Sequence, residues 1–200
     1  MAYSDFSLEK VKHQFNLVQK TIDLFPDETS IHPSDWLKQT LSMGLDLTVI
    51  SSSEKARGEL LVMPILLELR HHNNNSFAIY SGTTLDADNQ QGLNGECDFV
   101  LTIGEVAHAI TTPIFSLVET KKKDIDGYFG QCVAQMMGAR FYNQQQGNNI
   151  TTIYGCITTG DDWQFLKLED DTIFIDRKYY ALHPVERLLG VLQRVVETYL

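Results

Sequence analysis

The apolar residues of this chain change their spacing near residue 77, and this change constrains the fold more than any other feature of the sequence. Before it, hydrophobic side chains recur at steps of three and four, as in amphipathic helices. After it, residues 77–85, 96–103 and 114–121 have the alternation and the β-branched content of strands. We therefore expect a mixed α/β domain in which helices flank one sheet.

The residues before the change predict three helices. The first has an apolar stripe formed by Leu8, Val11, Phe15, Val18, Ile22 and Phe25. The second begins after Ser34, a suitable N-cap, and is expected to end at Gly44. The third covers residues 54–70 behind the serines at 51–53, and we expect Pro64 to kink or break it.

The residues after the three strands complete the expected order of elements. Helical spacing returns over residues 126–145, and residues 150–158 predict a further strand. Residues 163–168 and 172–176 predict a hairpin, and the chain closes with an amphipathic helix from Pro184. No fixed-period repeat or linker divides the sequence, which indicates a single domain.

Charge and cysteine content exclude several classes of protein. Lys and Arg number 16 against 26 Asp and Glu, a formal net charge of −10, which argues against a non-specific nucleic-acid coat protein. Cys97, Cys132 and Cys156 are too widely spaced for a disulfide framework or a zinc ribbon, and they suit a reducing compartment. We find no secretory signal and no apolar stretch of membrane-spanning length, so we expect a cytoplasmic protein.

One carboxylate interrupts an apolar strand. Asp98 lies in the run Cys-Asp-Phe-Val-Leu, and burying a lone carboxylate is costly unless it is paired or bound to a cation. The next strand ends in Glu119-Thr120-Lys121, where a period of two puts Glu119 and Lys121 on one face. If the two strands are neighbours, both carboxylates converge on one cation with Lys121 beside it. Mg²⁺ prefers such oxygen ligands, together with water and substrate phosphate.

The tripeptide Glu119-Thr120-Lys121 is not specific by itself. Asp176-Arg177-Lys178 also ends a strand-like run, but no acid lies partway along the strand before it. The first set has the intervening Asp98 and a helix directly afterwards. Its context, and not the tripeptide, therefore indicates a site.

Asp98, then Glu119-Thr120-Lys121, then a helix resembles the PD-(D/E)XK nuclease superfamily, and within it a single-domain family. The segments that carry the resemblance are SEKARGE (53–59), PILLELR (64–70), GLNGECDF (92–99), VETK (118–121), GQCVAQM (130–136) and YGCITTG (154–160). It implies a restriction-endonuclease-like α/β (α+β) fold, a mixed sheet with flanking helices in the core order αβββαβ. That core covers residues 50–200 of a single domain spanning 1–200, with 1–45 as an N-terminal helical extension.

The resemblance also implies roles at the site. Asp98, Glu119 and the backbone carbonyl of Thr120 are expected to hold Mg²⁺ or Mn²⁺, and Lys121 is expected to be the catalytic lysine. The proline that gives the motif its name is replaced here by Cys97, which weakens the motif without disabling it. The alternative is that the two carboxylates and the lysine form a structural ion pair at a sheet edge.

Five further residues are candidates, each with a plainer alternative. Glu59 and Gln131 match polar residues that the superfamily places near the metal, so they are catalytic candidates. Lys122, Lys123 and Gln135 are candidates for substrate binding. The alternatives are a solvated helical glutamate, glutamines that pack around buried backbone, and lysines in an exposed turn.

The expected function is Mg²⁺- or Mn²⁺-dependent hydrolysis of phosphodiester bonds in nucleic acid, DNA in particular. Paired cleavage of two strands suits a homodimer, and the N-terminal amphipathic helix offers an apolar interface for it. The rival hypothesis is a non-catalytic nuclease-fold module that serves as a scaffold for a protein partner, which the overall acidity favours. A third is an accessory subunit that is active only when assembled. The acidity also predicts weak, cation-dependent binding of nucleic acid.

Overall fold

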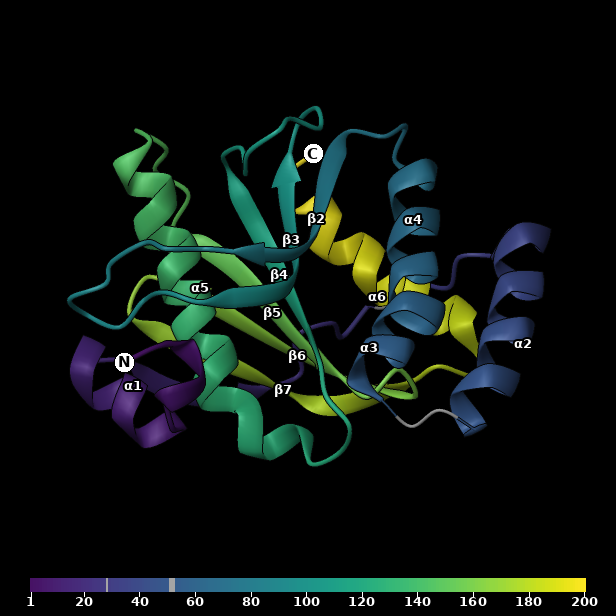
Figure 1. Cartoon of the computed structure of the whole chain (residues 1–200), viewed down its shortest axis with the longest axis horizontal. Coiled ribbons are helices and arrows are strands. Elements are labelled where there is room, and N and C mark those ends of the chain that lie inside the picture. Colours follow the sequence, from purple (N-terminus) through teal and green to yellow (C-terminus); the bar gives the residue numbers. More distant parts are fainter. Residues whose placement is uncertain (28, 51–52) are drawn as a thin grey trace.

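Residues 1–27, 29–50 and 53–200 are described by the structure, which is a computed structural model. Over these residues, seven strands form one mixed sheet in the order β1-β7-β6-β5-β4-β3-β2, with helices on both faces (Figure 1). The strands are β1 (Val18–Ile22), β2 (Phe77–Thr84), β3 (Glu96–Ile103), β4 (Ile114–Thr120), β5 (Thr152–Thr158), β6 (Asp162–Glu169) and β7 (Thr172–Ala181). The helices are η1 (Tyr3–Asp5), α1 (Leu8–Phe15), α2 (Asp35–Ile50), α3 (Glu54–Arg57), η2 (Gly58–Val62), α4 (Met63–His72), η3 (Ile125–Tyr128), α5 (Phe129–Gln145) and α6 (Val185–Glu197).

The sheet separates two apolar layers. On one face lies α5, against which η1 and α1 pack, while α2, α4 and α6 cover the other face. β4 and β5 are parallel neighbours, whereas β3 is antiparallel to both β2 and β4. Parallel neighbours need a crossover, here η3 and α5, so the start of α5 lies beside the end of β4. None of the helices among the described residues is long and apolar enough to cross a membrane.

The mixed α/β class and the order of elements after residue 77 are confirmed. β3 has the predicted bounds, and β7 runs to Ala181, beyond the predicted end of its strand. Strict alternation along β3 predicts that Cys97 shares a face with Phe99, Leu101 and Ile103, and this prediction is wrong for Cys97. Cys97 packs in the α5 layer and Phe99 in the opposite layer. The change of face falls where β3 leaves its pairing with β4, at Phe99.

The first predicted helix is correct only in its first half. α1 ends at Phe15, because Asn16 adopts a φ of 52°, the left-handed conformation that terminates helices. Residues 18–22 instead form β1, which pairs in parallel with β7 at one edge of the sheet. The segment predicted to be a helical extension therefore contributes a strand to the common sheet.

The apolar face of α1 is buried inside the chain. Val11 is fully buried, and the Phe15 ring packs edge-on against Phe141 of α5 with the ring centroids 6.3 Å apart. A Cβ on Gly130 of α5 would lie 2.3 Å from the carbonyl oxygen of Phe6, so the N-terminal segment touches the backbone of α5. This face is consequently not available as the dimer interface that the sequence suggested.

The second helix begins as predicted but does not end as predicted. Ser34 caps α2, since its Oγ accepts a hydrogen bond from the Leu37 N–H at 3.1 Å. Gly44 does not end the helix, which continues to Ile50. The glycine serves close packing instead, because a Cβ at Gly44 would lie 2.5 Å from the carbonyl oxygen of Leu60 in η2.

The third predicted helix is continuous but irregular. Ser53 caps α3, with its Oγ accepting from the Ala56 N–H at 3.1 Å, and the caps expected at Ser51 and Ser52 lie outside the described residues. Pro64 falls in the first turn of α4, directly after the π-helical η2. The wider π-helical turn leaves room for the proline ring. The helix therefore continues past Pro64 without the expected break.

Candidate active site

Two carboxylates occupy the opening where β3 and β4 part. The backbone pairing of these strands ends at Phe99 and Val118. Beyond it, each carboxylate reaches across to the backbone of the other strand. Glu119 Oε1 accepts from the Asp98 N–H at 3.3 Å, and Asp98 Oδ2 accepts from the Thr120 N–H at 2.6 Å. This exchange brings Asp98 and Glu119 together.

Glu119 is held by two amides of α5. Its side chain is almost fully buried, and its Oε1 accepts from Gln135 Nε2 at 2.5 Å. Its Oε2 accepts from Gln131 Nε2 at 3.0 Å. Residues four apart lie on one helix face, so the sequence predicts that the two glutamines point the same way. Only the crossover after β4 decides that this face meets Glu119.

Lys121 contributes a positive charge to the cluster that it forms with Asp98 and Glu119. Its Nζ lies 3.1 Å from Glu119 Oε2 and 4.8 Å from the centroid of the Tyr128 ring. Its backbone N–H donates to the Thr158 carbonyl at 2.7 Å, which fastens the end of β4 to β5. Only 9% of its surface is exposed. Among the described residues, Lys121 is the one basic side chain in ion-pair contact with either carboxylate.

Burial and repulsion make the cluster electrostatically unbalanced. Burial raises the pKa of Glu119, and the neighbouring Asp98 carboxylate raises it further. Burial also raises the pKa of Asp98, although the Thr120 N–H and the Lys121 ammonium oppose that shift. Burial by itself would lower the pKa of Lys121, but pairing with Glu119 prevails and the pKa is raised. One ammonium therefore faces two carboxylates, an excess of negative charge that a bound cation would relieve.

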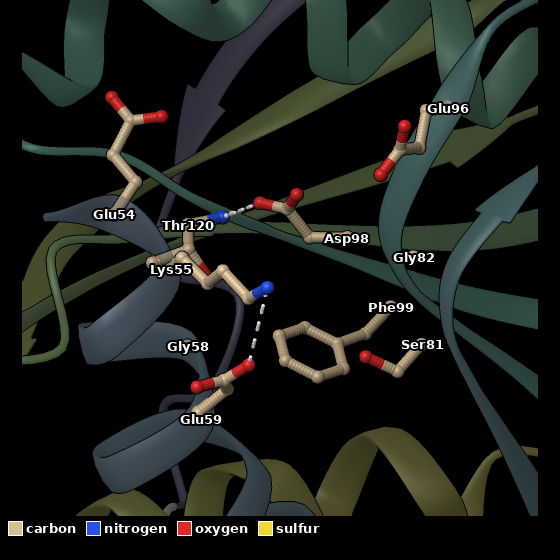
Figure 2. Close-up of a pocket in the computed structure, with 10 residues that line it drawn as sticks. All are labelled: Glu54, Lys55, Gly58, Glu59, Ser81, Gly82, Glu96, Asp98, Phe99 and Thr120. Atoms are coloured by element: carbon tan, nitrogen blue, oxygen red, sulfur yellow. Dashed lines mark hydrogen bonds and ion pairs between the residues drawn. The ribbon is translucent and has the colours of Figure 1, made fainter.

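Asp98 opens onto a pocket of about 550 Å³ between α3 and the β2–β3 hairpin (Figure 2). The lining residues are Glu54, Lys55, Gly58, Glu59, Ser81, Gly82, Glu96, Asp98, Phe99 and Thr120. The exposed acids Glu54, Glu59 and Glu96 line the pocket with Asp98, and Lys55 is the one basic residue among the described residues that line it. The pocket is thus acidic, a setting that attracts cations and repels an approaching phosphate.

The donors present fit a divalent cation held by two carboxylates. Asp98 uses Oδ2 for the Thr120 N–H, and its half-buried side chain lines the pocket, so a cation in the pocket would meet this carboxylate. Both oxygens of Glu119 already accept protein hydrogen bonds, so coordination there requires one donor to move. No three His, Cys, Asp or Glu side chains gather as a metal cluster within residues 1–27, 29–50 and 53–200. Mg²⁺ needs only one or two carboxylates, because water and phosphate complete its shell.

The other predicted residues lie around this centre. Glu59 stands exposed on the pocket wall, 3.9 Å from Lys55, and does not touch the carboxylate pair. Lys122 and Lys123 are exposed and line a second hollow of about 390 Å³ beside the first. Gln135 is fully buried behind Glu119, so from this position it contacts the carboxylate and not the surface where substrate would bind.

The competing tripeptide is structural. Asp176 is buried in β7 and accepts hydrogen bonds from the Tyr180 hydroxyl at 3.0 Å and from the Leu24 N–H at 3.3 Å. It ties the segment after β1 to the sheet. Arg177 lies 3.8 Å from Asp23 in an exposed ion pair. These residues belong to the opposite edge region of the sheet from β3.

Sequence reasoning missed three residues of the site. Tyr128 carries the ring beneath Lys121, and Glu54 accepts from the Lys122 N–H at 3.2 Å. Glu96 lies on the side of the pocket opposite Glu54 (Figure 2). No periodic signal marks them, because they lie at the ends of three different elements, α3, η3 and β3, which only the tertiary structure brings together.

Comparison with known proteins finds no family model and no curated protein that matches this chain. The case for a function therefore rests on the residues of the site and on their geometry.

Replacing Asp98 by asparagine is expected to stabilise the fold. The pKa values of Asp98 and Glu119 are both raised in the folded chain. Between the ordinary carboxyl pKa of about 4 and these raised values, the folded chain therefore binds more protons than the unfolded chain. Stability therefore falls as the pH rises through that window. Asp98→Asn removes the repulsion, and we expect a rise of about 2–4 °C in the thermal midpoint at neutral pH. Thermal melts between pH 4 and 8 measure both effects, and a lower midpoint for the variant would contradict the electrostatic account.

Proposed function

We propose that this chain is a Mg²⁺- or Mn²⁺-dependent phosphodiesterase of the PD-(D/E)XK type, with nucleic acid, DNA in particular, as its substrate. The observation that carries the proposal is the carboxylate pair of Asp98 and Glu119 at the parting of two strands, with Lys121 against it. The sequence of elements from α4 through β2, β3, β4 and α5 to β5 supports it, since the resemblance implies a core with one helix, three strands, one helix and one strand.

In this proposal each side chain has a distinct task. Asp98, Glu119 and the carbonyl of Thr120 hold the ion, which when bound supplies an activated water and positive charge for the phosphate oxygens. Lys121 orients the attacking water or binds a phosphate oxygen. Gln131 holds the Glu119 carboxylate in its orientation through the bond to Oε2.

The surroundings of the pair suggest how substrate would bind. Lys122 and Lys123 are exposed beside the site and would contact phosphates that flank the scissile bond. Glu59 on the pocket wall would favour the cation rather than the phosphate. With a net charge of −10, the chain would bind nucleic acid weakly and through the ion.

Compartment and assembly belong to the same proposal. Cys97, Cys132 and Cys156 are buried and unpaired, which suits the reducing cytoplasm. A homodimer remains the proposed assembly for cutting both strands, although its interface must lie elsewhere than on α1.

The test is metal-dependent nicking of supercoiled plasmid DNA. The wild type should convert the plasmid to open circles with Mg²⁺ or Mn²⁺ and should stop when the ions are chelated. Asp98→Ala and Lys121→Ala should each lower the rate by about 100-fold or more. Equal activity in the wild type and both variants, or none with either ion, would refute the catalytic proposal.

A non-catalytic scaffold is the second candidate, favoured by one observation. Both oxygens of Glu119 are already satisfied by protein donors, as in a purely structural carboxylate. That candidate predicts no heat on titration with Mn²⁺. An accessory subunit differs from both, because the isolated chain would bind Mn²⁺ and cut nothing.

A further inference from the structure

The charge at Glu119 is balanced from inside the chain. Among the described residues, four donors reach its carboxylate: the amides of Gln131 and Gln135, the Asp98 N–H and the Lys121 ammonium. The first three are neutral. Lys121 therefore supplies the only positive charge in contact with the pair among the described residues, and it does so at 3.1 Å from Oε2.

Two donors, Lys121 and the half-buried Gln131, bind Oε2 through flexible side chains, and of these only Lys121 takes a positive charge with it when it leaves. Gln135 is fully buried in α5, and the Asp98 N–H belongs to the β3 backbone, so neither can withdraw without moving an element. Lys121 has a long flexible stem, and its Nζ already lies 4.8 Å from the Tyr128 ring centroid. The ring offers the ammonium a second favourable contact after it releases Oε2.

We propose that Lys121 is a displaceable internal counter-ion: its ammonium takes the place of a divalent cation at Glu119, and the incoming cation must expel it. This inference rests on the proposed function, since it concerns the same site. Expulsion costs the ion pair, so Lys121 lowers the affinity of the site for metal. The exchange also links cation binding to the release of Lys121, because the lysine becomes free to contact substrate only when the cation is in place.

Substitution of an ordinary metal-site residue weakens metal binding, whereas loss of the Lys121 charge is expected to strengthen it. Lys121→Met removes the ammonium and keeps most of the side-chain volume, so it should bind Mn²⁺ about tenfold or more tightly than the wild type. The same variant should nick DNA poorly, because the lysine is lost from the chemistry. Lys121→Arg keeps the charge and should bind Mn²⁺ no more tightly than the wild type.

Calorimetric titration of the folded full-length variants with MnCl₂ tests this without any activity readout. Lys122→Met is the matched control. Lys122 is exposed, and its substitution removes the same formal charge without removing a contact to Glu119. The affinity of Lys122→Met for Mn²⁺ should differ from that of the wild type by less than about twofold, because solvent screens the exposed Lys122 charge. Should Lys121→Met fail to fold by circular dichroism, Lys121→Gln takes its place.

The outcomes separate this inference from the proposed function. Tighter binding in Lys121→Met and not in Lys122→Met supports it. Equal or weaker binding in Lys121→Met, with clear binding in the wild type, overturns the counter-ion role and leaves the proposed nuclease standing. No binding in the wild type or in either lysine variant overturns both.

Discussion

Glu119→Ala is expected to abolish Mn²⁺ binding and to lower plasmid nicking by about 10³-fold or more. Glu119 is the point at which β3, β4 and α5 meet, through Asp98, Lys121 and the two glutamines. Its loss removes a proposed cation ligand and releases the groups that it orients. Calorimetric titration with MnCl₂ and single-turnover nicking of plasmid measure the two effects.

The chain contains a matched control for this change. Glu169 ends β6 and pairs with Lys167 at 3.2 Å, which repeats the strand-end ion pair of Glu119 and Lys121 away from the site. Glu169→Ala should leave nicking and Mn²⁺ binding unchanged. Because alanine at 119 leaves Lys121 buried without its partner, Glu119→Gln, which keeps the volume, serves as a second variant. Undiminished nicking in both folded variants would rule out the role proposed for Glu119.

Gln135→Leu is expected to lower nicking by about 10- to 100-fold and to move the acidic limb of the pH–rate profile to higher pH. The Gln135 amide bonds to the ionised form of Glu119 and lowers its pKa, against the opposing effect of burial. Without that bond the pKa of Glu119 rises further, so the carboxylate ionises only at higher pH. Initial rates at saturating Mn²⁺ from pH 5 to 9 provide the measurement.

Asn143→Leu is the control for this second prediction. Asn143 is also a fully buried amide of α5, but it bonds to the N–H and the carbonyl of Ile114, both at 2.7 Å, far along the helix from Glu119. It should lose stability as Gln135→Leu does, yet keep the wild-type pH profile. If both variants shifted the profile alike, Gln135 would have no specific effect on Glu119.

Much of the site could be predicted from the sequence because it depends on strands with strong patterns. Asp98 was conspicuous as an acid in an apolar strand, and Glu119 and Lys121 followed at a spacing of two. Gln131 and Gln135 share a face by helical periodicity alone. That they lie against Glu119, and that Gln135 is buried behind it, depends on where the crossover sets α5 on the sheet.

The errors have a common cause, which is that local pattern cannot weigh tertiary contacts. Helical spacing through Val18 and Ile22 predicted one long helix, but pairing with β7 makes that segment a strand once Asn16 ends α1. Gly44 has the residue type of a helix stop, yet the close approach of η2 uses its missing side chain while the helix continues. Propensity was a weak prior in both cases, and packing decided the outcome.

The sequence by itself determined the class of fold and the chemistry available, because hydrophobic periodicity sets helices and strands, and a buried acid needs a partner. Tertiary structure alone decided the electrostatic state of the site. The parting of β3 and β4 turns two carboxylates toward each other, and the packing of η3 puts Tyr128 beneath Lys121. These contacts join residues that are distant along the chain, and their energies depend on burial, which no local pattern measures.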